Sequence, residues 1–190
     1  MPKKKIARII SELSNGFLTM ILTPVIAIYV STLDTFSKLT LSIAYLLSSI
    51  IPYFVLKAFG KVSDHEFTKR EERPPYFITL SILFAIIFFY TLTLDNILIQ
   101  NITLNIFLVT TVMTIVTFYW KISGHMTYST LLFVTLIFLF PDNPYLYLLF
   151  LFTPFIGWSR IVLEKHTLSQ VTAGTFVTLL ISILIYWPFC

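Results

Sequence analysis

The sequence predicts an all-α, polytopic transmembrane helical bundle with six to seven membrane spans. Of the 190 residues, 57% are hydrophobic and only 12% are charged, and the mean hydropathy is +0.87. Soluble domains contain about 45–50% apolar and about 25% charged residues, so a soluble fold could not bury this much apolar surface. The chain has no linker-like or repetitive segment, and we therefore expect one integral membrane domain over 1–190.

Uncharged stretches of bilayer-spanning length identify the first spans. A hydrocarbon core of about 30 Å requires about 20 apolar residues in helical form. Such stretches occur at 16–33, 39–56, 76–94 and 102–120. The basic segment Met1–Arg8 precedes the first of them without a small-residue cleavage signature, so we expect this first span to be retained.

The remaining spans are shorter. We expect helices at 126–140 and 145–158, separated by the turn Pro141–Pro144, and a last one at 167–189. A helix of about 15 residues is only about 22 Å long, so the two middle helices span the bilayer only if the polar motif beside them is recessed in the protein. The alternative is that 126–158 forms a re-entrant pair or merges with a neighbouring helix.

The positive charges concentrate in alternate loops. Lys38 is the one cation in the loops of the opposite side. The cations of the first side are Lys3, Lys4, Lys5, Arg8, Lys57, Lys61, Lys69, Arg70, Arg73, Lys121, Arg160 and Lys165. Cytoplasmic loops are enriched in Lys and Arg, so this face is predicted to be cytoplasmic, with Cys190 on the outside.

Reactive side chains lie in three short segments on this same side, 64–74, 123–125 and 159–166. Pairs of predicted helices separate the three segments, which returns each of them to one membrane face. Ionisable groups at a membrane boundary cost free energy, so their accumulation indicates a shared polar pocket. We assign His65 no catalytic role.

The residue types in these segments suit phosphoryl transfer without a metal. Arginine binds phosphate oxygens through two parallel N–H groups and stays charged. The Ser123-Gly124 turn offers backbone N–H groups. Of two histidines, one can attack phosphorus while the other protonates the leaving oxygen.

The three segments resemble the motifs of the type 2 phosphatidic acid phosphatase superfamily, the membrane lipid phosphatases that also include vanadium haloperoxidase-like proteins, and specifically a compact, divergent branch of it. That family carries Lys-x6-Arg-Pro, Pro-Ser-Gly-His and Ser-Arg-x5-His-x3-Asp. This chain has, in the same order, Arg73-Pro74, Ser123-Gly124-His125 and Ser159-Arg160-x5-His166-x3-Gln170. The motif-bearing core covers roughly 64–170.

The resemblance implies a role for each matching residue. His166 would be the nucleophile that forms a phosphohistidine, and His125 the general acid and later the base for water. The phosphate binders would be Arg73, Arg160, Ser123 and Gly124.

Three positions depart from the family pattern. Glu66 stands in place of the motif lysine, and Lys69, four residues before Arg73 and so on the same face of a helix, could substitute as a phosphate binder. Ile122 replaces a proline. Gln170 replaces the Asp that holds the nucleophilic imidazole, and its carbonyl can orient the ring but cannot supply negative charge. The carboxylates that could supply that charge are Glu164, Glu71 and Glu72.

We therefore expect a metal-independent lipid phosphatase that needs no cofactor and does not bind nucleic acid. Its substrate would be a phosphomonoester or pyrophosphate of a membrane lipid, either polyprenyl pyrophosphate or a phosphatidate-like lipid. The alternatives are a phosphotransferase between lipids and a catalytically degenerate protein that binds or transports lipid. The sequence does not specify the oligomeric state.

Overall fold

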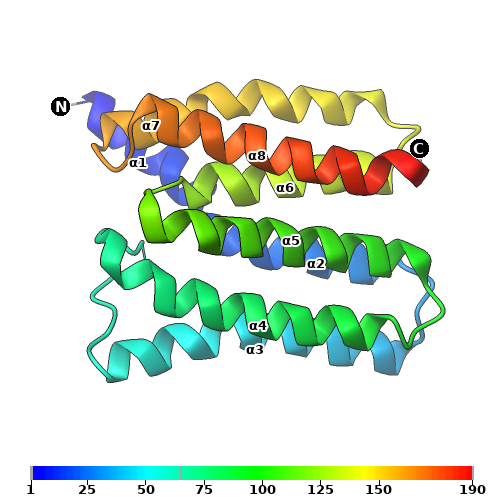
Figure 1. The fold of residues 1–190 in the computed structure, drawn as a ribbon. Coiled ribbons are helices and arrows are strands. Elements are labelled where there is room, and N and C mark those ends of the chain that lie inside the picture. The colour runs from blue at the N-terminus through cyan, green and yellow to red at the C-terminus, as the bar shows by residue number, and fades with distance from the viewer. Residues whose placement is uncertain (1, 65, 190) are drawn as a thin grey trace. The chain divides into compact units, whose positions relative to one another are not determined.

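The computed structural model of the protein describes residues 2–64 and 66–189, and within them it is all-helical (Figure 1). In chain order the elements are α1 (Pro2–Leu13), α2 (Gly16–Val30), α3 (Thr35–Ala58), η1 (Arg70–Glu72), α4 (Arg73–Thr91), α5 (Ile97–Tyr119), α6 (Gly124–Leu139), η2 (Pro144–Phe152), α7 (Thr153–Val162), α8 (Leu168–Tyr186) and η3 (Trp187–Phe189). The predicted fold class is confirmed. His65 and Cys190 lie outside the described residues.

Within the described residues, six helical stretches are long and apolar enough to cross a membrane, and α6 is a shorter apolar helix. The six are Pro2–Val30, Thr35–Ala58, Arg70–Thr91, Ile97–Tyr119, Pro144–Val162 and Leu168–Tyr186. Their number agrees with the predicted six to seven spans. By the length and composition of its helices, the chain is therefore an integral membrane protein.

The segment predicted as a short helix at 145–158 is longer and differently built. It begins with nine residues of 3-10 helix in η2 and continues as the ten-residue helix α7. A 3-10 helix rises about 2.0 Å per residue and an α-helix about 1.5 Å, so the two together extend about 33 Å. This length is sufficient to cross a hydrocarbon core of about 30 Å, which the shorter helix predicted from the sequence would not cross.

The amino-terminal region holds two helices where the sequence predicted one. The separate helix α1 ends at Leu13, and α2 begins after Asn15, whose Oδ1 accepts a hydrogen bond of 2.8 Å from the Phe17 amide. An asparagine at this position caps the new helix and ends the previous one. On α1, Ala7 and Ser11 are buried, while Ile6, Ile9 and Leu13 are exposed beside the cations.

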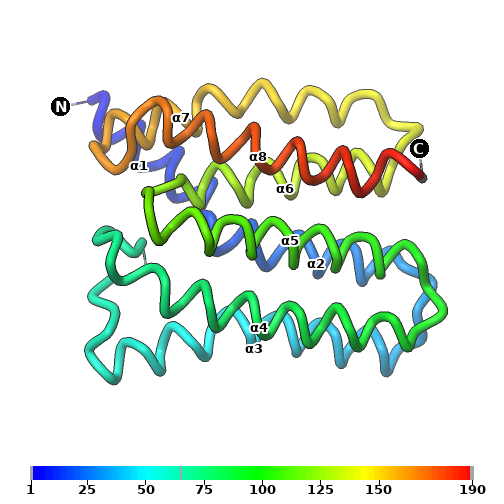
Figure 2. Tube along the Cα trace, in the orientation of Figure 1, coloured from blue at the N-terminus to red at the C-terminus, as the bar shows by residue number. Residues whose placement is uncertain are grey.

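The chain forms two compact units, each described by itself below. Unit 1 comprises Met1–Thr23 and Lys121–Cys190, and unit 2 comprises Pro24–Trp120. In unit 2, α4 packs against both α3 and α5. In unit 1, α6 packs against α8, and α1 packs against α7. The start of α6, the end of α7 and the start of α8 lie at the same end of unit 1 (Figure 2).

Candidate functional site

The turn that opens α6 is held against α8 by close backbone packing. The Ser123 amide donates a 3.3 Å hydrogen bond to the Gln170 carbonyl. A Cβ atom on Gly174 would lie 2.9 Å from the Ser123 carbonyl oxygen, and one on Gly16 would lie 3.0 Å from the Gly124 backbone. Real Cβ atoms essentially never come as close as 2.9 Å, and 3.0 Å is tighter than nine in ten real Cβ contacts, so the glycines allow α2 and α8 to approach this turn. The turn is therefore fixed from two sides.

Arg160, near the end of α7, is the centre of a buried polar cluster. Its guanidinium donates to the Ser11 hydroxyl and lies 3.3 Å from the Nε2 atom of His125, which is itself 3.5 Å from the Ser11 Oγ. All three residues are buried. Because a guanidinium can only donate, Nε2 of His125 acts as the acceptor in this arrangement. A buried cation, a hydroxyl and an imidazole thus converge from three different helices.

His166 follows α7 in the loop to α8, and its ring is held through Nδ1. That atom lies 3.2 Å from the Lys121 carbonyl oxygen and 3.2 Å from Gln170 Oε1. Both neighbours are acceptors, so Nδ1 carries the proton and the lone pair resides on Nε2. The backbone amide of His166 also donates to the Arg160 carbonyl at 3.3 Å. Both histidines are therefore tied to Arg160, one through its side chain and the other through its backbone.

Gln170 has two tasks at the start of α8. Its Oε1 accepts from the Thr167 amide at 3.1 Å, which closes a capping box with the Thr167 hydroxyl. The same oxygen is the one that faces His166. The capping bond fixes which end of the amide is oxygen, because only an oxygen can accept from the Thr167 N–H.

Several hydroxyls at the start of α6 are buried without a partner among the described residues. The Oγ of Ser123 and the hydroxyls of Thr127 and Ser129 all belong to this group. An unpaired buried hydroxyl is costly, and native proteins keep few of them. Of the three, Ser123 lies in the turn that opens α6 and Ser129 lines a cavity, so these two hydroxyls could bond a polar ligand.

The carboxylates that the sequence offered as substitutes for the family's Asp are engaged elsewhere. The Glu164 carboxylate accepts a 2.9 Å bond from Lys4, and its side chain is 77% exposed. This bond lowers the pKa of Glu164 below its ordinary value. In unit 2, Glu71 pairs with Arg70 and Glu72 with Lys69.

Arg73 and Lys69, the remaining predicted phosphate binders, belong to unit 2. Arg73 is buried, and its Nε donates to the Phe67 carbonyl at 3.1 Å. The prediction that Lys69 and Arg73 share a helical face is wrong, because Lys69 is extended and a 3-10 turn precedes α4. Pro74 and Pro75 favour a helix start at this point, since their fixed φ suits the first turn. The role of both cations in phosphate binding stays a prediction.

Ser11 is the site residue that the sequence analysis missed. It contacts Arg160 across 149 positions of sequence, and no spacing rule connects the two. One signal was present: Ala7 and Ser11 are small residues four positions apart in a segment of long side chains. Small residues at this spacing allow two helices to pack closely in a membrane protein.

Among the described residues, no group of three or more His, Cys, Asp or Glu could hold a metal ion. The chain matches no family model, no curated protein and no solved structure. The site is therefore interpreted from its own geometry.

Proposed function

We propose that the protein is a membrane-embedded, metal-independent lipid phosphatase that acts through a phosphohistidine. One observation carries the proposal: the buried Arg160 guanidinium reaches both His125 and Ser11, beside a second histidine whose Nδ1 is held by two acceptors. The arrangement supplies a fixed cation for phosphate oxygens and two imidazoles with different tasks. The motif resemblance points to the same chemistry.

The reaction has two steps. Nε2 of His166 attacks phosphorus, the bond from phosphorus to the lipid oxygen breaks, and His125 gives that oxygen a proton. Water then attacks the phosphohistidine and loses a proton to His125, and the N–P bond breaks to release phosphate. Arg160 neutralises the phosphoryl oxygens in both steps. The Ser123 hydroxyl, buried and without a partner among the described residues, is a further donor to the phosphate.

Purified protein should release inorganic phosphate from lipid phosphates, and His166→Ala should abolish the release. His125→Ala should lower it by about 10²- to 10⁴-fold, the usual contribution of a general acid. A suitable panel holds short- and long-chain phosphatidates, prenyl monophosphates and prenyl pyrophosphates. Acid-labile ³²P bound to the wild type but absent from His166→Ala would identify the intermediate. Equal release by all three proteins would exclude this mechanism.

Two further measurements address the narrower parts of the proposal. Chelators should leave the rate unchanged, and a chelator-sensitive activity would refute metal independence. An acceptor lipid added to the assay tests phosphotransfer, because a phosphorylated acceptor would then form at the expense of free phosphate.

The alternative is a catalytically degenerate protein that binds lipid. It is favoured by Gln170 and Glu66, which depart from the family pattern, and it predicts that the panel lipids bind without release of phosphate.

The orientation is proposed from charge alone, with the site on the cytoplasmic face. In a Cys190→Ser background, Gly60→Cys after α3 and Thr93→Cys after α4 lie in consecutive loops. A membrane-impermeant maleimide applied to intact cells should label Thr93→Cys and not Gly60→Cys. The reverse pattern would invert the proposed sidedness.

A further inference from the structure

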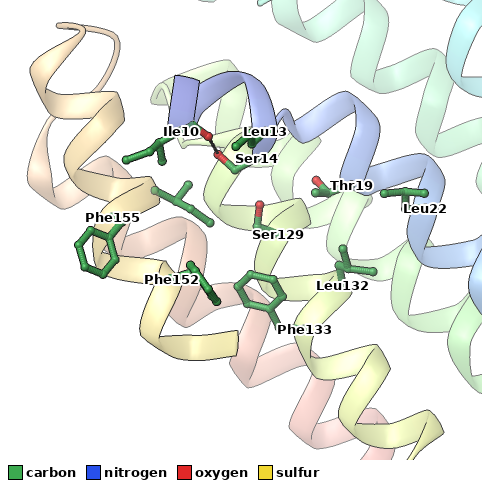
Figure 3. A pocket seen from close by; sticks show the side chains of 11 residues that line it. Ile10, Leu13, Ser14, Thr19, Leu22, Ser129, Leu132, Phe133, Phe152 and Phe155 are labelled. Atoms are coloured by element: carbon green, nitrogen blue, oxygen red, sulfur yellow. Dashed lines mark hydrogen bonds between the residues drawn. The ribbon is translucent and has the colours of Figure 1, made fainter. Parts of the chain in front are cut away.

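An apolar cavity of about 570 Å³ lies within unit 1 (Figure 3), inside the range of about 300–1,000 Å³ that is usual for ligand sites. Its lining comes from α1, α2, α6, η2 and α7. The lining residues are Ile10, Leu13, Ser14, Thr19, Leu22, Ser129, Leu132, Phe133, Phe152, Phe155 and Ile156. None of them is charged, so the cavity suits a hydrocarbon chain.

The cavity begins where the polar cluster ends, on two helices independently. On α6, Ser129 and Phe133 follow His125 at intervals of four residues, and residues so spaced share one face of a helix. On α7, Ile156 lies four residues before Arg160 and also lines the cavity. At 1.5 Å per residue, each step is about 6 Å. Both helices therefore change from ionisable to apolar within one turn.

The third contributor, α1, makes the same transition. Ser11 contacts Arg160, while the adjacent Ile10 and the next-turn residue Ser14 line the cavity. The cluster and the cavity are thus consecutive parts of one site. A molecule with an anionic head and a hydrocarbon tail matches that sequence of environments.

One hydroxyl in the cavity wall is unsatisfied. Ser14 donates to the Ile10 carbonyl at 2.7 Å, and Thr19 bonds the Asn15 carbonyl at 3.2 Å. Ser129 is 2% exposed, and its buried hydroxyl has no hydrogen-bond partner among the described residues. Figure 3 shows its oxygen directed toward Ser14 and Thr19 and away from the rings of Phe133 and Phe152. A tail without oxygen would leave Ser129 unpaired.

We infer that this cavity takes the chain of a glycerol-based lipid phosphate, with the Ser129 hydroxyl donating to the ester or ether oxygen next to the phosphate-bearing carbon. The inference rests on the proposed function and chooses between its two substrate classes. A prenyl monophosphate has no oxygen one helical turn beyond the phosphate. A prenyl pyrophosphate has oxygen atoms at that distance, on its inner phosphate. That phosphate is charged, however, and no residue that lines the cavity is a cation that could neutralise it.

The test compares Ser129→Ala on two substrates, dioctanoylglycerol phosphate and farnesyl phosphate. Loss of one neutral hydrogen bond should raise KM for the glycerol lipid about 2- to 10-fold and leave the farnesyl phosphate value unchanged. Thr127→Val is the matched control, because it removes another unpartnered buried hydroxyl of α6 that does not line the cavity. It should change neither KM. Equal effects of Ser129→Ala on both substrates, or no effect on either, would overturn the role of Ser129.

Two further pairs of substrates extend the test. Ser129→Ala should raise KM equally for an ester-linked and an ether-linked glycerol lipid, and it should leave KM for farnesyl pyrophosphate unchanged, as for farnesyl phosphate.

A binding measurement separates this inference from the proposed function. A phosphatidate analogue with a diazirine in its chain should crosslink to the helices that line the cavity, α1, α2, α6, η2 or α7, and Ser129→Leu, which fills the cavity, should reduce that labelling at least 5-fold. If the wild type releases no phosphate but this labelling pattern holds, the phosphatase proposal fails and the lipid site stands. Labelling elsewhere, or labelling that Ser129→Leu does not change, would overturn the site even in an active enzyme.

Discussion

Units 1 and 2 both bury polar side chains, but they do so in different ways. In unit 2, hydroxyls pair between α4 and α5: Thr91 with Thr103 at 2.9 Å, and Ser81 with Thr114 at 2.8 Å. These pairs use uncharged groups that satisfy each other. In unit 1, the buried set includes Arg160 and the two histidines, together with hydroxyls of α6 that have no partner among the described residues.

This difference distinguishes buried polar groups that only stabilise the fold from buried polar groups that indicate a ligand site. Paired hydroxyls between membrane helices contribute modestly to helix association and require nothing from outside the protein. Ionisable groups cost far more to bury, and unpaired hydroxyls add to that cost. Unit 1 concentrates this cost around Arg160 and the first turns of α6, where an anionic, oxygen-bearing ligand would offset it, whereas the buried Arg73 of unit 2 already donates to the Phe67 carbonyl.

The largest effect is expected from Arg160→Lys, which keeps the charge and removes the planar fork. A lysine cannot donate to both Ser11 and a phosphate in the same geometry, so activity should fall about 10²- to 10³-fold. Arg70→Lys is the control, since Arg70 is an exposed cation whose NH1 donates to the Phe118 carbonyl at 3.0 Å. Phosphate release at saturating substrate measures both. A similar loss in the two variants would mean that unit 1 has no special role.

Gln170 should give the next largest effect. Gln170→Leu removes one of the two acceptors that hold Nδ1 of His166, so kcat should fall about tenfold, the cost of about 1.4 kcal/mol for a lost orienting bond. Gln170→Asp should keep or raise kcat, because a carboxylate also stabilises a positive imidazole. The pH profile of kcat distinguishes a changed hydrogen bond to His166 from a folding defect, because a folding defect would leave the shape of the profile unchanged. Ser169→Ala, one position earlier, should leave the profile unchanged, and a Gln170→Asp enzyme slower than Gln170→Leu would contradict the orienting role.

The spans, and the shared end of the motifs at 123–125 and 159–166, could be predicted because hydropathy is a local property. An even number of helices between His125 and His166 returns both to one face, whatever the packing. The contact of Ser11 with Arg160 could not be predicted, because it depends on α1 packing against α7. The 3-10 helix at Pro144–Phe152 was missed for another reason: its apolar composition fits an α-helix equally well.

Gly174 allows α8 to approach the turn at Ser123 closely, and replacing it should have a smaller effect than the substitutions at Arg160 and Gln170. Gly174→Ala would place a Cβ 2.9 Å from the Ser123 carbonyl, so α6 and α8 must separate at the site, with an expected loss of about 1–3 kcal/mol in stability and reduced activity. Gly157→Ala is matched, because its Cβ would meet Val171 at an ordinary 3.6 Å. Thermal unfolding in detergent and phosphate release report the two effects. Equal stability of the two variants would show that the turn at Ser123 tolerates displacement.

The smallest effect is expected in unit 2. Thr91→Val removes the hydroxyl that bonds Thr103 and the Phe88 carbonyl, and such bonds in membrane proteins average about 0.6 kcal/mol with a maximum of about 1.7. The variant should therefore unfold slightly more easily and release phosphate at the wild-type rate. Thr93→Val provides the comparison, since its exposed hydroxyl bonds only the Tyr90 carbonyl among the described residues and should cost less. A double-mutant cycle with Thr103→Val isolates the pair. If Thr91→Val instead lowered activity without lowering stability, paired hydroxyls would also matter for function, and the contrast between the two units would not hold.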